Sequence, residues 1–435
     1  MIDIAENSEL YILYELILYD TIYSVVDNGS KTNKKNFERR YIVTETNQKK
    51  SILVEMVDQL DLPQYVVKKT VHRYESLGEW FDREKSTLKD VDIFPQGSFA
   101  LGTTIRPIND KEEYDLDMGC KVKIPDFKSV YTQEQLKKMV GIELENYRNA
   151  KGIRKVLEPK HRCWRLEYMD EVNFHLDIVP CIPLHRDKQS EYKKQLEDAF
   201  GYKEFLNNSV TDVAINITDD RHDDYTNISH DWIISNPEGY LKWFESRMTS
   251  ETMLFSNRTS VTPVPLYNRK TTLQRCIQLL KRHRDNMFGD DKSKPISIII
   301  TTLAARAYNG ETNIEEAVLN LLNEMPSYIN SSSPRVSNPV NPNEDFTDRW
   351  DMPEGRKLDL EGNFRNWLMQ AKIDFNNLVK ADSYEKANLI INSKFALKMD
   401  KDALQQRYNY KAEKWNSVTT VPKNPPKPWG DAYQY

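Results

Sequence analysis

The sequence predicts an α+β protein in which a core of strands and helices is followed by a second lobe made of helices. Short apolar runs typical of strands, such as NFHLDIVPCIP, lie within residues 90–190. Helical patterns precede them at residues 49–87 and follow them from about 237 to 410. The chain has 435 residues, of which 39% are apolar, so it can fill the cores of two subdomains.

The N-terminal segment predicts two helices, at residues 7–30 and 49–87, and the second ends in the amphipathic sequence VVKKTVHRYESLGEWF. The first contains the run LYILYELILYDTIYSVV, which Glu15 and Asp20 interrupt. It lacks the basic start and cleavage site of a signal peptide, and no stretch approaches the ~18 apolar residues of a membrane span. We therefore expect an amphipathic helix packed on the body of a cytoplasmic protein that does not associate with a membrane.

The rest of the chain is divided by its connectors. Asp-rich and Asn-rich segments near 207–236 precede the helical lobe, which the segment INSSSPRVSNPVNPNED interrupts. Prolines near the C-terminus exclude regular structure there. We predict four parts: N-terminal helices packing on the core (1–89), the core (90–236), the helical lobe (237–415) and a flexible Pro-rich tail (416–435).

The segment FPQGSFALGTTIRPINDKEEYDLDMG carries the strongest functional signal. Gly97 and Ser98 form a turn whose backbone N–H groups and hydroxyl suit phosphate oxygens. Asp115 and Asp117 stand two apart in a strand, so their side chains share one face while the apolar residues Leu116 and Met118 face the core. Two neighbouring carboxylates repel each other, and a divalent cation such as Mg²⁺ carrying a nucleoside triphosphate (NTP) relieves that repulsion.

A third carboxylate, Asp177, lies in the apolar run NFHLDIVPCIP, which is typical of a central strand. An acid in such a strand is costly to bury unless it is paired or bound to metal. The pattern Asp-x-Asp alone is more often a solvated strand face. The Gly-Ser turn, the flanking apolar residues and Asp177 together predict a metal site.

This pattern of Gly-Ser, acid-apolar-acid-apolar and a later strand Asp resembles the DNA polymerase β-like nucleotidyltransferases. Within that superfamily the chain is similar to the bacterial cGAS/DncV-like nucleotidyltransferases (CD-NTases), which make cyclic oligonucleotide signals in anti-phage defence (CBASS). The resemblance covers about residues 90–370 and implies a polymerase β-like core with a mixed sheet and a helical second lobe. Its supporting segments are SNPEGYLKWF, LQRCIQLLKRHRD, KPISIIITTLAARAY and NPVNPNEDFTDRW.

The resemblance implies roles for the residues of the first motif. Gly97 and Ser98 would hold the triphosphate of the donor NTP. Asp115 and Asp117 would bind two Mg²⁺ ions, with Mn²⁺ as a possible substitute. Asp177 would complete the site of the metal that activates the attacking sugar hydroxyl.

Four further positions follow from the same resemblance. Lys281 and Ser297 match residues that contact the triphosphate; the alternatives are that Lys281 lies at a solvated helix end and that Ser297 simply begins a helix. Arg165 resembles an arginine that contacts a nucleobase, with solvent or Glu167 as the alternative partner. Leu101 stands where some relatives stack an aromatic residue on the base, which leaves the choice of base open.

Composition limits the partners. The four cysteines form no Cys-x-x-Cys pair, so we expect buried thiols in a reducing cytoplasm and none of the zinc-bearing insertion of the animal DNA sensor of the family. The net charge of −5 is not that of a duplex binder, and no nucleic-acid activator is expected. The cysteines are Cys120, Cys163, Cys181 and Cys276.

We therefore expect an enzyme that makes a cyclic di- or trinucleotide from NTPs, ATP among them, by two-metal-ion catalysis in anti-phage defence. Two alternatives stay open: transfer of a nucleotide to an RNA end, a protein or a small molecule, and an inactive nucleotide-binding scaffold, which the three acids disfavour. The end of the chain, residues 421–435, combines four prolines with Trp429, Tyr433 and Tyr435. It is either a disordered terminus or a handle for a protein regulator.

Overall fold

The computed structural model describes residues 51–109, 114–169, 173–201, 204–248, 262 and 270–400. By its contacts the chain divides into two units, Met1–Lys49 and Lys50–Tyr435, and all described residues belong to the second. The helix expected at 7–30 and the tail expected at 416–435 lie outside the described residues. The predicted division at residues 89, 236 and 415 stays a prediction.

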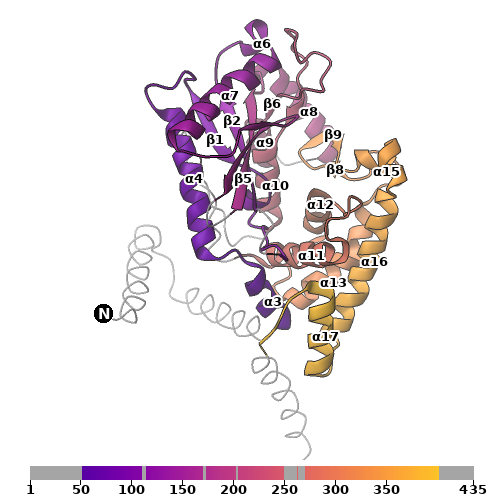
Figure 1. The fold of residues 1–435 in the computed structure, drawn as a ribbon. Coiled ribbons are helices and arrows are strands. Elements are labelled where there is room, and N and C mark those ends of the chain that lie inside the picture. The colour runs from indigo at the N-terminus through magenta and orange to yellow at the C-terminus, as the bar shows by residue number, and fades with distance from the viewer. Residues whose placement is uncertain are drawn as a thin grey trace, which may run out of the picture. The chain divides into compact units, whose positions relative to one another are not determined.

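A mixed sheet of seven strands forms the first half of the described fold (Figure 1). Five strands follow the order β1-β2-β5-β4-β3, while β6 pairs with the end of β5 and β7 pairs with β6. The β2–β5 pair is parallel and the other pairs are antiparallel. The strands are β1 (Val91–Pro95), β2 (Tyr114–Val122), β3 (Glu158–Pro159), β4 (Trp164–Met169), β5 (Asn173–Pro183), β6 (Ile215–Ile217) and β7 (Ile234–Ser235).

Helices cover one face of this sheet with a continuous apolar core. Leu116 and Met118 of β2 and Leu176 and Ile178 of β5 are fully buried in it, as the alternation of these strands predicts. Helices α4 and α7 contribute the other side of the core. The helices that accompany the sheet are α4 (Gln64–Asp82), α5 (Gly97–Ala100), α6 (Phe127–Val130), α7 (Gln133–Ala150), α8 (Arg186–Phe200) and α9 (Glu204–Thr211).

A second and larger apolar core belongs to the helical lobe, drawn from salmon to yellow in Figure 1. Its central helix, α11, begins with a capping box in which Thr271 and Gln274 satisfy each other's backbone N–H groups. The lobe contains α10 (Pro237–Arg247), α11 (Thr272–Phe288), α12 (Ser297–Ala307), α13 (Ile314–Glu324), the 3₁₀ turn η1 (Met325–Tyr328), α14 (Asp348–Asp351), α15 (Pro353–Lys357), α16 (Leu360–Val379) and α17 (Tyr384–Phe395).

The segment predicted as one helix over 49–87 forms two. Helix α3 (Ile52–Leu60) ends before Pro63, and α4 begins after it, because a proline lacks the N–H that a helix interior requires and disfavours helical geometry in the residue before it. Both were expected to pack on the core. Helix α4 packs on the sheet, whereas α3 packs against α11 and α13 in the helical lobe.

Two smaller differences concern the loop at 329–345 and the cysteines. The loop contains a short hairpin, β8 (Ser337–Asn338) and β9 (Asn341–Asp345), which the Ser/Pro/Asn composition did not indicate. All four cysteines are free thiols. Three are buried as expected, but Cys163 is only half-buried because it lies in the turn before β4. Within the part of the chain that the structure describes, no helix has the length and apolar character to cross a bilayer.

Candidate active site

The parallel pairing of β2 with β5 brings the three predicted aspartates together. Asp117 lies directly opposite Asp177, and Asp115 lies opposite His175. The residues that alternate with these four along β2 and β5 are buried in the core under α4 and α7. The four side chains therefore project from the opposite face of the sheet. The predicted acidic cluster is therefore a product of strand register.

Two of these acids already have cationic or hydrogen-bonding partners. Arg165 of β4 lies opposite Asp177 and donates from Nε to Oδ1 at 2.8 Å and from Nη2 to Oδ2 at 2.6 Å. His175 Nε2 contacts Asp115 Oδ1. The predicted alternative in which Arg165 pairs with Glu167 is wrong, because Glu167 forms its ion pair with Lys155 at 3.5 Å.

The electrostatics of the three acids differ. Burial raises the pKa of Asp117 to about 6, and repulsion from Asp177 and Asp115 adds to this effect. Burial also acts to raise the pKa of Asp115, but the hydrogen bond and charge of His175 and the charge of Arg165 outweigh it and lower that pKa. The hydrogen bonds to Asp177 raise the pKa of the Arg165 guanidinium.

The donor set fits a divalent cation. Carboxylate oxygens are the ligands that Mg²⁺ and Mn²⁺ prefer, and the raised pKa of Asp117 shows repulsion that such a cation would relieve. Among the described residues, no three His, Cys, Asp or Glu side chains are already arranged to hold a metal ion. At this site both oxygens of Asp177 are engaged by Arg165.

The Gly-Ser turn lies against the same acids. Gly97 has a φ of +62°, and a Cβ atom placed on it would lie 2.2 Å from Asp117 Oδ2. The N–H of Gln96 donates to the backbone oxygen of Asp117 at 2.8 Å. Only glycine permits both the backbone conformation and the close approach, so the turn and the carboxylates form one unit.

The loop after this turn is held by helix α11. The Ser98 hydroxyl lies 3.0 Å from that of Thr104, and the N–H of Thr103 donates to Ser98 O at 2.9 Å. Lys281 Nζ then donates to the backbone oxygen of Thr103 at 3.1 Å and to its hydroxyl at 2.9 Å. Lys281 is thus a buried residue behind the turn and does not lie at a solvated helix end.

Three more side chains of α11, which the sequence did not reveal, bind this loop. Gln274, Gln278 and Arg282 donate to the backbone oxygens of residues 101, 104 and 106 at 2.9, 2.8 and 2.6 Å. With Lys281 they occupy one face of the helix at spacings of four, three and one residues. A row of long polar side chains on one face of an apolar helix was the sequence feature that could have indicated these contacts.

The remaining predicted positions lie near this helix. Burial lowers the pKa of Lys281 to about 7, and the charge of Arg284 contributes. Ser297 is the first residue of α12, and its hydroxyl accepts a hydrogen bond from Arg284 Nη1 at 2.7 Å. Leu101 is buried in the apolar core of the helical lobe. These contacts place Lys281 next to the loop that follows the Gly-Ser turn and join Ser297 to Arg284.

Comparison with known proteins gives consistent results. Residues 91–181 match the family described as "Cyclic GMP-AMP synthase DncV-like, nucleotidyltransferase domain". A c-di-GMP synthase of Roseivirga ehrenbergii is 30% identical over 336 residues, which cover 74% of this chain and 77% of that protein. The cyclic dinucleotide synthase CdnG of Bradyrhizobium diazoefficiens is 26% identical over 326 residues, 69% of this chain and 70% of that one.

The solved structure of the B. diazoefficiens CD-NTase CdnG in complex with GTP has the same fold, with a TM-score of 0.56 and 20% identity, and covers 85% of this chain and 99% of that one. The mixed sheet, the helical lobe and the acidic cluster beside a Gly-Ser turn, together with these matches, define a nucleotidyltransferase. The chain belongs to the cGAS/DncV-like nucleotidyltransferases, the CD-NTases.

Substitution of Gly97 tests the contact between the turn and Asp117. We expect Gly97→Ala to lower nucleotidyl transfer at least about tenfold, because the added carbon would displace the Asp117 carboxylate. The matched control is Gly152→Ala: Gly152 has a φ of +66°, but a Cβ added there would meet nothing within 4 Å. Both variants should lose about 1 kcal/mol of stability from the backbone conformation. Pyrophosphate release and urea unfolding measure the two effects, and equal activity losses would contradict the prediction.

The raised pKa of Asp117 predicts a pH-dependent stability. Its folded-state pKa of about 6 exceeds the ordinary 3.8, so ionisation costs the folded state stability as pH rises from about 4 to about 6, and the cost is constant above that. Metal-free Asp117→Asn should therefore be more stable than wild type by at most about 3 kcal/mol at pH 7.5 and equal to it near pH 3.5. Urea unfolding at both pH values measures this.

The control for that measurement is Asp290→Asn, since Asp290 is exposed in the turn after α11. Its stability relative to wild type should change little between the two pH values. A gain for Asp117→Asn that is the same at pH 3.5 and pH 7.5 would show that ionisation of Asp117 does not destabilise the fold, and so would contradict the raised pKa.

Proposed function

We propose that this enzyme makes a cyclic dinucleotide from NTPs, with GTP as a substrate. The observation that carries the proposal is the register that sets Asp117 opposite Asp177, with Asp115 on the same face and Gly97 against Asp117. Two relatives are named a c-di-GMP synthase and a cyclic dinucleotide synthase, and the structural neighbour was solved with GTP. These names support a cyclic product that consists of two nucleotides and contains guanine.

The proposed reaction joins two nucleotides twice. A ribose hydroxyl of one nucleotide attacks the α-phosphorus of the other and pyrophosphate leaves, and a second attack in the linear intermediate closes the ring with loss of a second pyrophosphate. The backbone of Gly97 and the hydroxyl of Ser98 bind the triphosphate and align it for in-line attack. The turn suits this role because no side chain obstructs the approach of phosphate oxygens at Gly97.

Asp115, Asp117 and Asp177 are the residues that would hold Mg²⁺ or Mn²⁺. When bound, these ions supply charge neutralisation for the pyrophosphate and lower the pKa of the attacking hydroxyl. The carboxylates themselves add negative charge on the face of the sheet where the nucleotide must bind. Lys281, which lies behind the loop, offsets part of that charge for the triphosphate when its amino group is protonated.

The proposed activity predicts a specific product. Incubated with Mg²⁺ and GTP alone, the full chain should release pyrophosphate and form a phosphatase-resistant cyclic dinucleotide, without nucleic acid. Mass spectrometry identifies the ring size, and parallel reactions with all four NTPs reveal any other base, ATP included. Linkage-specific nucleases then distinguish 2′–5′ from 3′–5′ bonds in the product.

The control for this reaction is the double variant Asp115→Asn/Asp117→Asn, in which turnover should fall at least about a thousandfold because amides hold divalent metal far more weakly than carboxylates do. Cells that carry it should also lose phage protection if the product serves anti-phage defence. A linear product with a terminal phosphate would favour transfer to another acceptor. Wild-type activity in the double variant would remove this active site from consideration.

Lys281 is proposed to keep the phosphate-binding loop in place and to lend it positive charge. Replacing it with Met removes both hydrogen bonds to Thr103 and should weaken Mg·GTP binding about tenfold at pH 7. Isothermal titration with a GTP analogue that carries a methylene group between its α- and β-phosphates separates binding from turnover. Lys292→Met, at an exposed lysine just beyond α11, should bind GTP as before. Unchanged affinity in Lys281→Met would exclude the role.

A further inference from the structure

The ion pair between Arg165 and Asp177 occupies the third carboxylate of the site. Both oxygens of Asp177 accept hydrogen bonds from the planar guanidinium, and the two side chains are only 27% and 16% exposed. Bidentate, charge-assisted pairs of this type are among the stronger polar contacts in proteins. A cation that binds Asp177 has to compete with this guanidinium.

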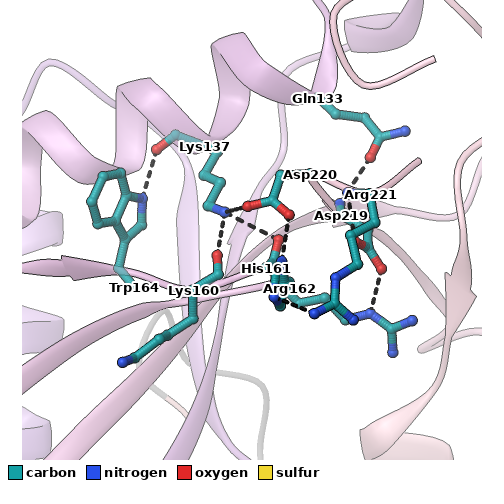
Figure 2. Close-up of polar contacts among 9 residues, drawn as sticks. All are labelled: Gln133, Lys137, Lys160, His161, Arg162, Trp164, Asp219, Asp220 and Arg221. Atoms are coloured by element: carbon teal, nitrogen blue, oxygen red, sulfur yellow. Dashed lines mark hydrogen bonds and ion pairs between the residues drawn. The ribbon is translucent and has the colours of Figure 1, made fainter. Parts of the chain in front are cut away.

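Arg165 is fixed in this position by the packing of its hairpin. Figure 2 shows the turn between β3 and β4, toward which the side chain of Lys137 extends from α7. Its buried Nζ donates to the backbone oxygens of Lys160 and His161, the latter at 3.0 Å, and to Asp220 Oδ2 at 3.2 Å. Asp220 also contacts His161 Nδ1 at 2.7 Å. The turn is therefore anchored to α7 and to the segment after β6.

A second set of contacts holds the start of β4. Trp164, the residue before Arg165, donates from Nε1 to the backbone oxygen of Lys137 at 2.8 Å. Its ring packs so closely on Gly141 that a Cβ there would lie 2.5 Å from it. On the other side of the turn, Arg162 donates to Asp219 at 2.7 Å (Figure 2). The backbone of Arg165 thus cannot shift freely away from Asp177.

We propose that Arg165 is a built-in counter-ion that holds Asp177 in the nucleotide-free enzyme and keeps divalent metal from binding there tightly until a nucleotide arrives. This inference rests on the proposed metal-binding function of the three aspartates. A triphosphate arrives with a bound metal ion, and its anionic oxygens offer the Arg165 guanidinium an alternative to Asp177. Nucleotide binding therefore shifts the competition for Asp177 from Arg165 to the metal. Metal binding at Asp177 and nucleotide binding are then coupled.

The test is a Mn²⁺ titration of the nucleotide-free full chain, followed by electron paramagnetic resonance of free Mn²⁺. Arg165→Gln should bind Mn²⁺ about tenfold more tightly than wild type, because the competing cation is gone. Adding Asp177→Asn to that variant should remove the gain. Arg165→Lys keeps the charge but loses the two-pronged geometry, so its affinity should lie between the two.

The matched control is Arg154→Gln, which removes an exposed arginine from the loop between α7 and β3. It should bind Mn²⁺ as wild type does. Thermal unfolding with and without Mn²⁺ verifies that each variant folds, and the metal should raise the Tm of Arg165→Gln more than that of wild type.

The inference is overturned if neither Arg165→Gln nor Arg165→Lys binds Mn²⁺ more tightly than wild type. Its failure is distinguishable from failure of the proposed function. In the first case wild-type turnover with Mg²⁺ and GTP persists and still depends on Asp115 and Asp117. In the second, the Asp115→Asn/Asp117→Asn variant stays active.

Discussion

Repulsion between carboxylates across a parallel strand pair governs this structure. Asp117 and Asp177 face each other in register on β2 and β5, and burial together with this repulsion raises the pKa of Asp117. Neighbouring side chains reduce that repulsion, since Arg165 forms an ion pair with Asp177 and His175 contacts Asp115. The fold keeps the three acids together although the ionised Asp117 destabilises it, which is the arrangement expected where function requires a site that stability alone would not select.

The two apolar cores support different parts of this site. The sheet and its covering helices fix the aspartates, while α11 of the helical lobe fixes the loop that follows the Gly-Ser turn. The proposed catalytic groups and the proposed phosphate-binding groups therefore depend on separate cores. Gly97, in contact with Asp117, is where the two sets come together, and its lack of a side chain makes that contact possible.

Much of the fold could be predicted from local patterns. The alternation around Asp115 and Asp177 gave the strands and their exposed face, and Pro63 could have indicated the break between α3 and α4. The partners of the acids could not be predicted, because they depend on which strands pair and in what register. Arg165 meets Asp177 twelve residues away through an antiparallel pair. Leu101 offered no signal of its burial under a lobe that begins more than a hundred residues later.

The side chains of α11 bind the loop through backbone oxygens, with Lys281 contacting the Thr103 hydroxyl as well. Every residue type carries a backbone oxygen, so most of this recognition is independent of which side chains the loop presents. Residues 104 and 106 can therefore change with little effect on the hold of α11, whereas Leu101 is constrained because its side chain is buried in the apolar core of the helical lobe. The four donor side chains of α11 cannot vary in this way, because each must keep its length and its hydrogen-bonding capacity.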